Sequence, residues 1–176
     1  MSLTVQELSA CQARERVGDF VALSKAVIDA GSHLGWDVSF DGIAVSGYWQ
    51  HRSRDIDGRN VLLFGSFSSD DLLGTVQLER GHFPTSLHRA EVAKLMVAPS
   101  ARRRGIASQL MDELEKRAVT IGIELLVLDT RAGEPVEILY QRRGYTRTGH
   151  VPHWMKYRDG SYKDTVFFYK LLKENI

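Results

Sequence analysis

The chain has 176 residues, of which 43% are hydrophobic and 26% charged, and its formal net charge is +1. These values are ordinary for one globular domain and leave no large excess of positive charge for general nucleic-acid binding. The single cysteine, Cys11, excludes an intramolecular disulfide framework and a cysteine-based zinc site. No apolar run approaches the roughly 20 residues that span a bilayer. We therefore expect a single cytoplasmic domain over residues 1–176, with no metal, no membrane and no nucleic acid among its partners; the sequence does not indicate an oligomeric state.

The first 60 residues predict one strand and two helices. Residues 4–8 are strand-like, and apolar side chains recur at helical spacing over residues 14–30 and, more weakly, over residues 41–54. Strand patterns then follow at 60–67 and 72–79. The turn Ser-Ser-Asp-Asp between them favours a hairpin.

The second half alternates strands and helices. A strand over residues 90–97 is followed by Pro99 and by a helix in which Ile106, Leu110, Leu114, Ala118 and Ile121 lie on one face. The next strand, 124–130, is connected to 90–97 through this helix, which predicts a parallel pair. A short helix from Pro135 to Gly144 and strands at 145–149 and 165–172 complete the chain. The pattern predicts an α/β fold in which a mixed central sheet carries helices on both faces.

Three features of the second half are expected at the carboxyl ends of its strands, where ligands bind in open α/β sheets. The first is a basic turn before a helix N-terminus, where positive charge is unfavourable unless an anion compensates it. Small residues there allow successive N–H groups to surround a phosphate. The other two features are Asp129, at the end of the strand LLVLD, and Tyr140, on the apolar face of the last helix. The predicted anion-binding residues are Arg102, Arg103, Arg104, Gly105, Ile106, Ala107 and Ser108.

Two motifs carry a resemblance to a known family. The segment RRRGIA at 102–107 matches the R/Q-x-x-G-x-G/A motif of the GNAT superfamily of acetyl-CoA-dependent N-acetyltransferases, and LYQRRGY at 139–145 matches its L-Y-x-x-x-G-F/Y motif. Within that superfamily, RAEVAKLMVAPSARRRGIASQLMDELE, LDTRAG and YTRTG are most similar to the tabtoxin-resistance acetyltransferases. One departure is Gly133 to Pro135, where the superfamily often has an asparagine.

The resemblance implies a GNAT fold and transfer of acetyl from acetyl-CoA to an amine of a small molecule, such as a toxin or an antibiotic-like compound. The backbone of a bulged strand at Leu95, Met96 and Val97 would bind the pantetheine arm, and the amides of residues 102–108 would bind the pyrophosphate. Glu91 would be the base, with Asp129 as a second carboxylate. Tyr140 would protonate the departing thiolate.

Several alternatives stay open. The same scaffold could acetylate a protein, a peptide or a polyamine, and the missing asparagine would also suit a non-catalytic acyl-CoA-binding module. RNA binding through the arginines would require affinity that falls steeply with salt. Glu91 could instead pair with Arg89 or Lys94, Asp129 could cap a turn, and Tyr140 could be a core aromatic residue. The aromatic, acidic and histidine side chains that could line an acceptor pocket, or simply belong to the core or a hairpin, are Tyr48, Trp49, Glu79, His82, His150, His153 and Trp154.

Overall fold

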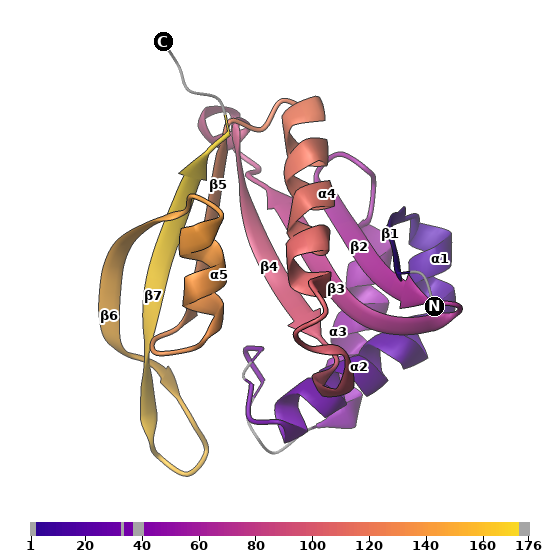
Figure 1. The fold of residues 1–176 in the computed structure, drawn as a ribbon, viewed down its shortest axis with the longest axis horizontal. Coiled ribbons are helices and arrows are strands. Elements are labelled where there is room, and N and C mark those ends of the chain that lie inside the picture. Colours follow the sequence, from indigo (N-terminus) through magenta and orange to yellow (C-terminus); the bar gives the residue numbers. More distant parts are fainter. Residues whose placement is uncertain (1–2, 33, 37–40, 173–176) are drawn as a thin grey trace.

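The computed structural model describes residues 3–32, 34–36 and 41–172, and its centre is a seven-stranded mixed sheet with helices on both faces (Figure 1). This arrangement confirms the predicted fold class. The strands are β1 (Leu3–Leu8), β2 (Val61–Ser68), β3 (Asp71–Arg80), β4 (Arg89–Val97), β5 (Leu125–Arg131), β6 (Thr146–Lys156) and β7 (Tyr162–Leu171). The helices are α1 (Ala10–Glu15), α2 (Val17–Asp29), α3 (Gly42–Asp55), α4 (Ile106–Thr120) and α5 (Val136–Arg142), with short 3-10 turns η1 (Pro84–Ser86) and η2 (Pro99–Ala101).

The strand order is β1-β2-β3-β4-β5-β7-β6, and all neighbours are antiparallel except β4 and β5. The parallel pair joined by a helix and the hairpin between β2 and β3 are both as predicted. Helices α4 and α5 lie on one face of the sheet, and α1, α2 and α3 lie on the other (Figure 1). None of the helices in the described ranges is long and apolar enough to cross a membrane.

Each face of the sheet has its own apolar core. Under α4, the buried residues Ile106, Leu110, Met111 and Leu114 pack on Leu62, Val76, Leu78, Ala90, Val92, Leu126 and Leu128 of the strands. Under α2 and α3, the core is formed by Phe20, Leu23, Val27, Val45, Trp49, Leu63, Phe67 and Met96. On this second face α2 packs on β3 and β4, α1 packs on β1, and α3 packs on α1 and α2.

Two elements differ from the sequence prediction. The helix expected over 14–30 is two helices, because Ser9 starts α1 with a capping box to Gln12 and the chain bends at Arg16, whose φ is −104° and ψ 16°. The guanidinium of Arg16 pairs with Asp19 and Asp70, which holds the bend against the β2–β3 turn. Strand β6 extends to Lys156 instead of ending at residue 149. Its pairing with β7 is irregular between Val151 and Met155, which lets the strand continue past Pro152.

Strand β4 is irregular where the site forms. Thr75 pairs with Met96 and Gln77 pairs with Ala93, so β4 carries one extra residue between these pairs, and Lys94 there has φ 50°. This is a β-bulge, as the family resemblance implied. Strand β4 pairs with β5 only from Arg89 to Glu91, and beyond this point the two strands diverge (Figure 1).

Candidate active site

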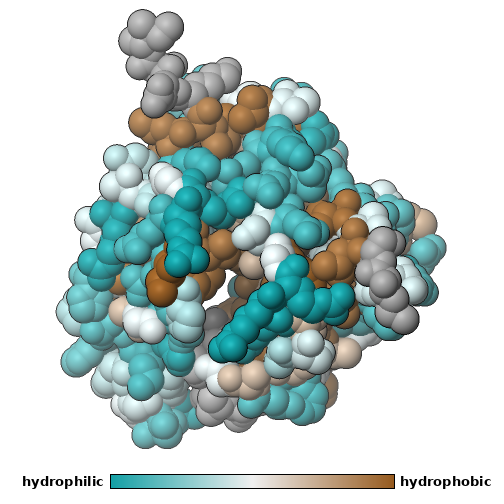
Figure 2. Space-filling view, in the orientation of Figure 1, coloured by the Kyte–Doolittle hydropathy of each residue, from teal (hydrophilic) through white to brown (hydrophobic). Residues whose placement is uncertain are grey.

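A cleft of about 1340 Å³ opens where β4 and β5 diverge. Its walls are the bulged half of β4, the N-terminus of α4, the end of β5, the helix α5 and the segment that follows α2. In Figure 2 the middle of the molecule is hollowed between its two halves, with hydrophilic side chains around the opening. The volume exceeds the roughly 300–1,000 Å³ of ordinary small-molecule pockets. The cleft therefore has room for a long ligand together with a second one.

One end of the cleft is suited to an anion. Helix α4 begins after Gly105, whose φ is 78°, and no side-chain cap forms there among the described residues. The first N–H groups of a helix have no partner inside it, so those of α4 are free to bind a ligand. Arg103 also has a positive φ, 61°, which is uncommon for a residue with a Cβ atom. Such an uncapped helix start between basic side chains is a phosphate-binding arrangement.

The predicted anion-binding residues lie together at this end, with one exception. Those that line the cleft are Arg102, Arg103, Gly105, Ile106, Ala107 and Ser108, while Arg104 lies outside the lining. The guanidinium of Arg102 donates to Ser32 Oγ at 3.2 Å, which connects the turn to the end of α2. Leu95, Met96 and Val97 line the next part of the cleft.

Glu91 and Asp129 both line the cleft from neighbouring strands. Glu91 pairs in register with Val127, and Asp129 is two residues further along β5, so both side chains lie on the same face of the sheet. Partial desolvation, together with the carboxylates of Glu79 and Asp129, raises the pKa of Glu91 above its ordinary value. The site therefore contains one carboxylate with raised basicity beside a second one.

A hydrogen bond fixes the second carboxylate. Thr165 on β7 donates from Oγ1 to Asp129 Oδ2 at 3.1 Å. The same hydroxyl lies 2.9 Å from the carbonyl oxygen of Thr130, so its one proton is shared between the side chain of Asp129 and the backbone.

Tyr140 reaches the cleft from α5 and is only 5% exposed. Its ring packs against Tyr145 and Phe168, with centroids 5.7 Å from each. Burial and the charge of Asp129 raise the pKa of Tyr140 well above its usual range, so the phenol is protonated at neutral pH. No side chain of the described residues forms a hydrogen bond with its hydroxyl, which leaves this group available to a ligand.

Among the cleft residues that were not selected from the sequence, three have polar contacts that bear on the site: Lys94, Arg143 and Thr165. Lys94 could have been found from the sequence, since a lysine interrupts the apolar segment AEVAKLMV. No sequence feature marked Arg143 as a site residue, because its role depends on tertiary contacts. It donates to the carbonyl of Ser108 at 3.2 Å and pairs with Asp112 at 2.8 Å and Glu115 at 3.2 Å, thereby joining α5 to the first turns of α4.

The acceptor-pocket candidates separate into several environments. Trp154 alone lines the cleft. Trp49 belongs to the core, where its ring stacks on Phe20 at 4.7 Å and its Nε1 donates to Ser24. Tyr48 is partly buried and donates to Gln77 at 2.9 Å, and Glu79 pairs with Arg52 at 3.1 Å.

The three candidate histidines lie outside the cleft lining. His150 pairs with Asp164 at 2.9 Å, His153 stacks on Tyr162 at 4.7 Å, and His82 is exposed in the turn after β3. Throughout the part of the chain that the structure describes, no cluster of three or more His, Cys, Asp or Glu side chains suits a metal ion.

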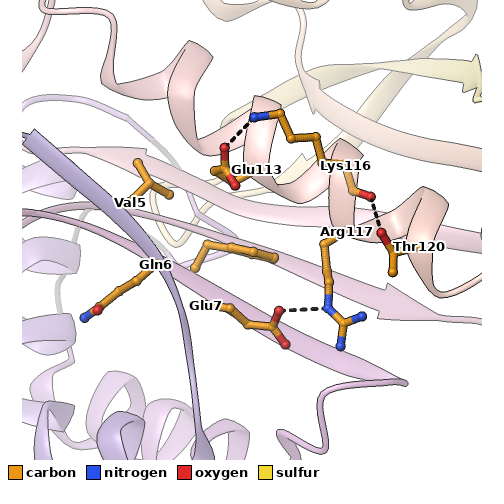
Figure 3. Close-up of a pocket in the computed structure, with 8 residues that line it drawn as sticks. Val5, Gln6, Glu7, Glu113, Lys116, Arg117 and Thr120 are labelled. Carbon is orange, nitrogen blue, oxygen red and sulfur yellow. Dashed lines mark hydrogen bonds and ion pairs between the residues drawn. The ribbon is translucent and has the colours of Figure 1, made fainter.

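A second, smaller cavity of about 230 Å³ lies between β1 and the C-terminal half of α4 (Figure 3). Charged side chains close it, with Glu7 paired to Arg117 at 2.9 Å and Lys116 paired to Glu113 at 2.7 Å. It shares no lining residue with the large cleft, and its charges neutralise each other. We therefore assign the chemistry to the large cleft.

Comparison with known proteins identifies the same architecture. Residues 33–145 match the acetyltransferase (GNAT) family. An N-acetyltransferase from Staphylococcus aureus Mu50 is 19% identical, with a TM-score of 0.79 over 98% of this chain and 100% of that one. A ribosomal-protein-alanine N-acetyltransferase from Brucella melitensis is 18% identical, with a TM-score of 0.76 over 96% and 99% of the two chains. The Salmonella typhimurium protein yncA, solved with its cofactor acetyl-CoA, is 15% identical, with a TM-score of 0.77 over 100% and 97%. At these identities the solved structures show a common fold.

Proposed function

Because this chain belongs to the acetyltransferase (GNAT) family and uses acetyl-CoA as the donor, we propose that it acetylates an amine of a small molecule, such as an antibiotic-like or toxin-like compound. The observation that carries this proposal is the cleft between β4 and β5, in which an uncapped helix N-terminus, two carboxylates and a buried tyrosine face one space. The lone cysteine fits the reducing cytoplasm, where we place the enzyme.

The residues along the cleft fit the donor. The amides of Gly105 to Ser108, with Arg102 and Arg103, would hold the pyrophosphate, since free N–H groups and positive charge coincide there. The backbone of Leu95, Met96 and Val97 would hold the pantetheine arm, because this segment has lost its pairing with β5. Acetyl-CoA supplies an activated acetyl group as a thioester.

The carboxylates would remove the proton from the acceptor amine, because only a neutral amine has the lone pair needed for attack. Glu91 is our candidate base, and its raised pKa brings it closer to the pH at which it works. Asp129, fixed by Thr165, would orient the ammonium or a water between the two carboxylates. Holding amine and thioester side by side would supply most of the rate, an effect that can reach roughly 7–11 kcal/mol.

Tyr140 would stabilise the departing sulfur. A free thiol has a pKa of about 8.5 and an ordinary phenol about 10, and burial raises the pKa of Tyr140 further. Complete proton transfer from this phenol to a thiolate is therefore uphill. A hydrogen bond from the hydroxyl to the developing thiolate fits these values better than full transfer, so Tyr140 acts chiefly as a donor of that bond.

A second acceptor class is favoured by one observation. Glu91 and Asp129 line the cleft from adjacent strands, and neighbouring carboxylates of this kind attract a cation with more than one amine. A polyamine is accordingly the second candidate acceptor on the same catalytic machinery.

The test is thiol release from acetyl-CoA with a panel of amino-acid-like antibiotics and toxins, polyamines and dipeptides, beside calorimetric titration with acetyl-CoA. Turnover of one small-molecule class supports the proposal, and selective turnover of spermidine would move the acceptor to polyamines. Tight acetyl-CoA binding without turnover across the panel would favour a non-catalytic acyl-CoA-binding module.

A further inference from the structure

Lys94 occupies an unusual place in the site. Its φ of 50° creates the bulge in β4, and the carbonyl of the same residue accepts a hydrogen bond from Thr75 Oγ1 at 3.1 Å. Leu95, Met96 and Val97 follow it directly along the cleft wall. The backbone that would hold the donor therefore begins at Lys94.

The side chain of Lys94 points to the opposite wall. Its Nζ donates to the carbonyl of Leu34 at 2.8 Å and lies 5.0 Å from the ring centroid of Trp36 and 5.2 Å from that of Tyr48. The two rings meet edge to face at 5.1 Å. A carbonyl oxygen and two aromatic rings are suitable partners for an ammonium ion, so one side chain joins the bulge to the segment after α2 and to α3.

The ammonium also lies among the charges that surround Glu91. The groups that act on Glu91 are Glu79 from β3, Asp129 from β5, Arg52 from α3 and Lys94 from β4 itself. Lys94 and Arg52 lower the pKa of Glu91, against the effects of desolvation and of the two carboxylates. Of the two cations, Lys94 has the larger effect on Glu91; its charge also interacts with Glu79 and Asp129, and burial lowers the pKa of Lys94 itself.

We propose that Lys94 is a positioning residue for acetyl transfer: its ammonium fastens the bulge of β4 to Leu34, Trp36 and Tyr48 and places a positive charge beside Glu91. The inference rests on the proposed function, because the bulge matters only if it orients the donor. One side chain would thereby contribute both to the geometry of the donor strand and to the ionisation of the base.

Substitution can separate charge from volume. Lys94→Met keeps a long unbranched side chain against the two rings and removes the ammonium, whereas Lys94→Arg keeps a positive charge that can lie on aromatic faces. Lys116→Met is the matched control, because Lys116 is exposed on α4 and, within residues 3–32, 34–36 and 41–172, forms its one ion pair with Glu113.

The first measurement follows the Glu91 carboxyl by NMR in protein labelled with ¹³C-glutamate, with Glu91→Gln to assign the signal. We expect the pKa of Glu91 to rise in Lys94→Met, to stay near the original value in Lys94→Arg and to be unchanged in Lys116→Met. If Lys94→Met does not fold, Lys94→Gln removes the same charge while keeping a donor for Leu34. An unchanged Glu91 titration in the folded neutral variant would overturn the proposal.

The second measurement is kinetic. In Lys94→Met, kcat should fall by about tenfold or more, because small misplacements of reacting groups have large effects on rate. The acid limb of the pH–rate profile of Lys94→Met should move to higher pH. Its Kd for acetyl-CoA should change by less than about threefold, since the pyrophosphate end of the cleft is intact. Lys94→Arg should restore much of kcat. Equal losses of kcat and donor affinity without rescue by arginine would assign Lys94 a merely structural role. If the unaltered protein acetylates no amine, the proposed function fails, and the NMR titration still decides whether Lys94 controls Glu91.

Discussion

Glu91 lies directly opposite Glu79 on the neighbouring strand, a pairing of like charges that is unfavourable in a sheet. Arg52 compensates Glu79 through an ion pair at 3.1 Å, which leaves Glu91 beside Asp129 in the cleft. Placing Glu91 close to two other carboxylates, those of Glu79 and Asp129, lowers the stability of the fold. Such an arrangement is typical of a functional site rather than of packing.

Glu91→Gln should lower kcat by roughly 10²- to 10⁴-fold, the range in which general base catalysis contributes. Combined with Asp129→Asn, it should abolish turnover while acetyl-CoA still binds, since neither side chain lies at the anion end of the cleft. Stopped assays and calorimetry on the same samples measure both quantities. Full activity in the double variant would refute the assignment of the base.

The pH dependence has a defined sign. Because the pKa of Glu91 is raised, the base becomes ionised only at a higher pH than an ordinary glutamate, and kcat/KM should increase with pH through that value. A profile of kcat/KM for the amine, from pH 4 upward, measures the limb. In Glu91→Gln this limb should disappear; if it persists unchanged, another group controls it.

Tyr140→Phe should slow the acetyl step more than it weakens donor binding. The ring keeps its contacts with Tyr145 and Phe168, and none of the side-chain hydrogen bonds among the described residues is lost, so stability should not fall. Single-turnover kinetics and thermal melting test the two halves of this expectation. An unchanged rate would make Tyr140 a core residue only.

At the scale of single residues, the sequence predicted those site residues that a local motif or their place in an element marks. The RRRG turn, Asp129 at a strand end and the tyrosine of the last helix all follow from spacing and from motifs. Thr165 could not be found in this way, because its hydrogen bond to Asp129 depends on the register of β7 beside β5, which brings together residues 36 positions apart.

Among the elements, the bulge in β4 depends on a close approach by β3. A Cβ atom on Gly74 would lie 2.7 Å from the carbonyl oxygen of Met96 and 3.1 Å from side-chain atoms of Ile106 and Leu110. Since backbone cannot yield as a flexible side chain can, only glycine fits between the bulge and the start of α4.

Gly74→Ala should therefore reduce the free energy of unfolding by about 1–3 kcal/mol, as overpacking commonly does. It should also weaken acetyl-CoA binding, because the added Cβ presses on Ile106 and Leu110 at the helix start that would hold the pyrophosphate. Gly149→Ala is the control, since a Cβ atom there meets nothing within 4 Å. Urea denaturation and calorimetry measure both effects. Equal stabilities of the two variants would show that the close approach can relax.

Sequence patterns predicted most elements because apolar periodicity and capping residues are local. The bend between α1 and α2 was missed because Gly18 lies inside the first turn of α2 and not at the bend itself, and the ion pair of Arg16 to Asp70 comes from a distant turn. The extension of β6 was missed because Pro152 ordinarily argues against a strand, and only pairing with β7 shows that it is accommodated.

In the whole molecule, the two cores lie on opposite faces of the same strands, β2 to β4. Disrupting one core therefore removes support from the strands on which the other core packs. Ligand binding at the cleft should therefore stabilise the entire fold. At a concentration 100 times its Kd, acetyl-CoA should add about 2.7 kcal/mol, which corresponds to a rise in Tm of roughly 5–11 °C for a chain of this size. Thermal scans with acetyl-CoA, and with acetate as the control, test this; a shift limited to one of two separate transitions would contradict a single cooperative unit.

The divergence of β4 from β5 also has a consequence for behaviour in solution. Past Glu91, the facing sides of the two strands present backbone N–H and C=O groups that do not pair with each other, so the sheet contains two open edges in its interior. Open edges are templates for strand addition and self-association. In the proposed complex the pantetheine arm would occupy this gap much as an additional strand would, so the enzyme should self-associate less with its donor bound than without it.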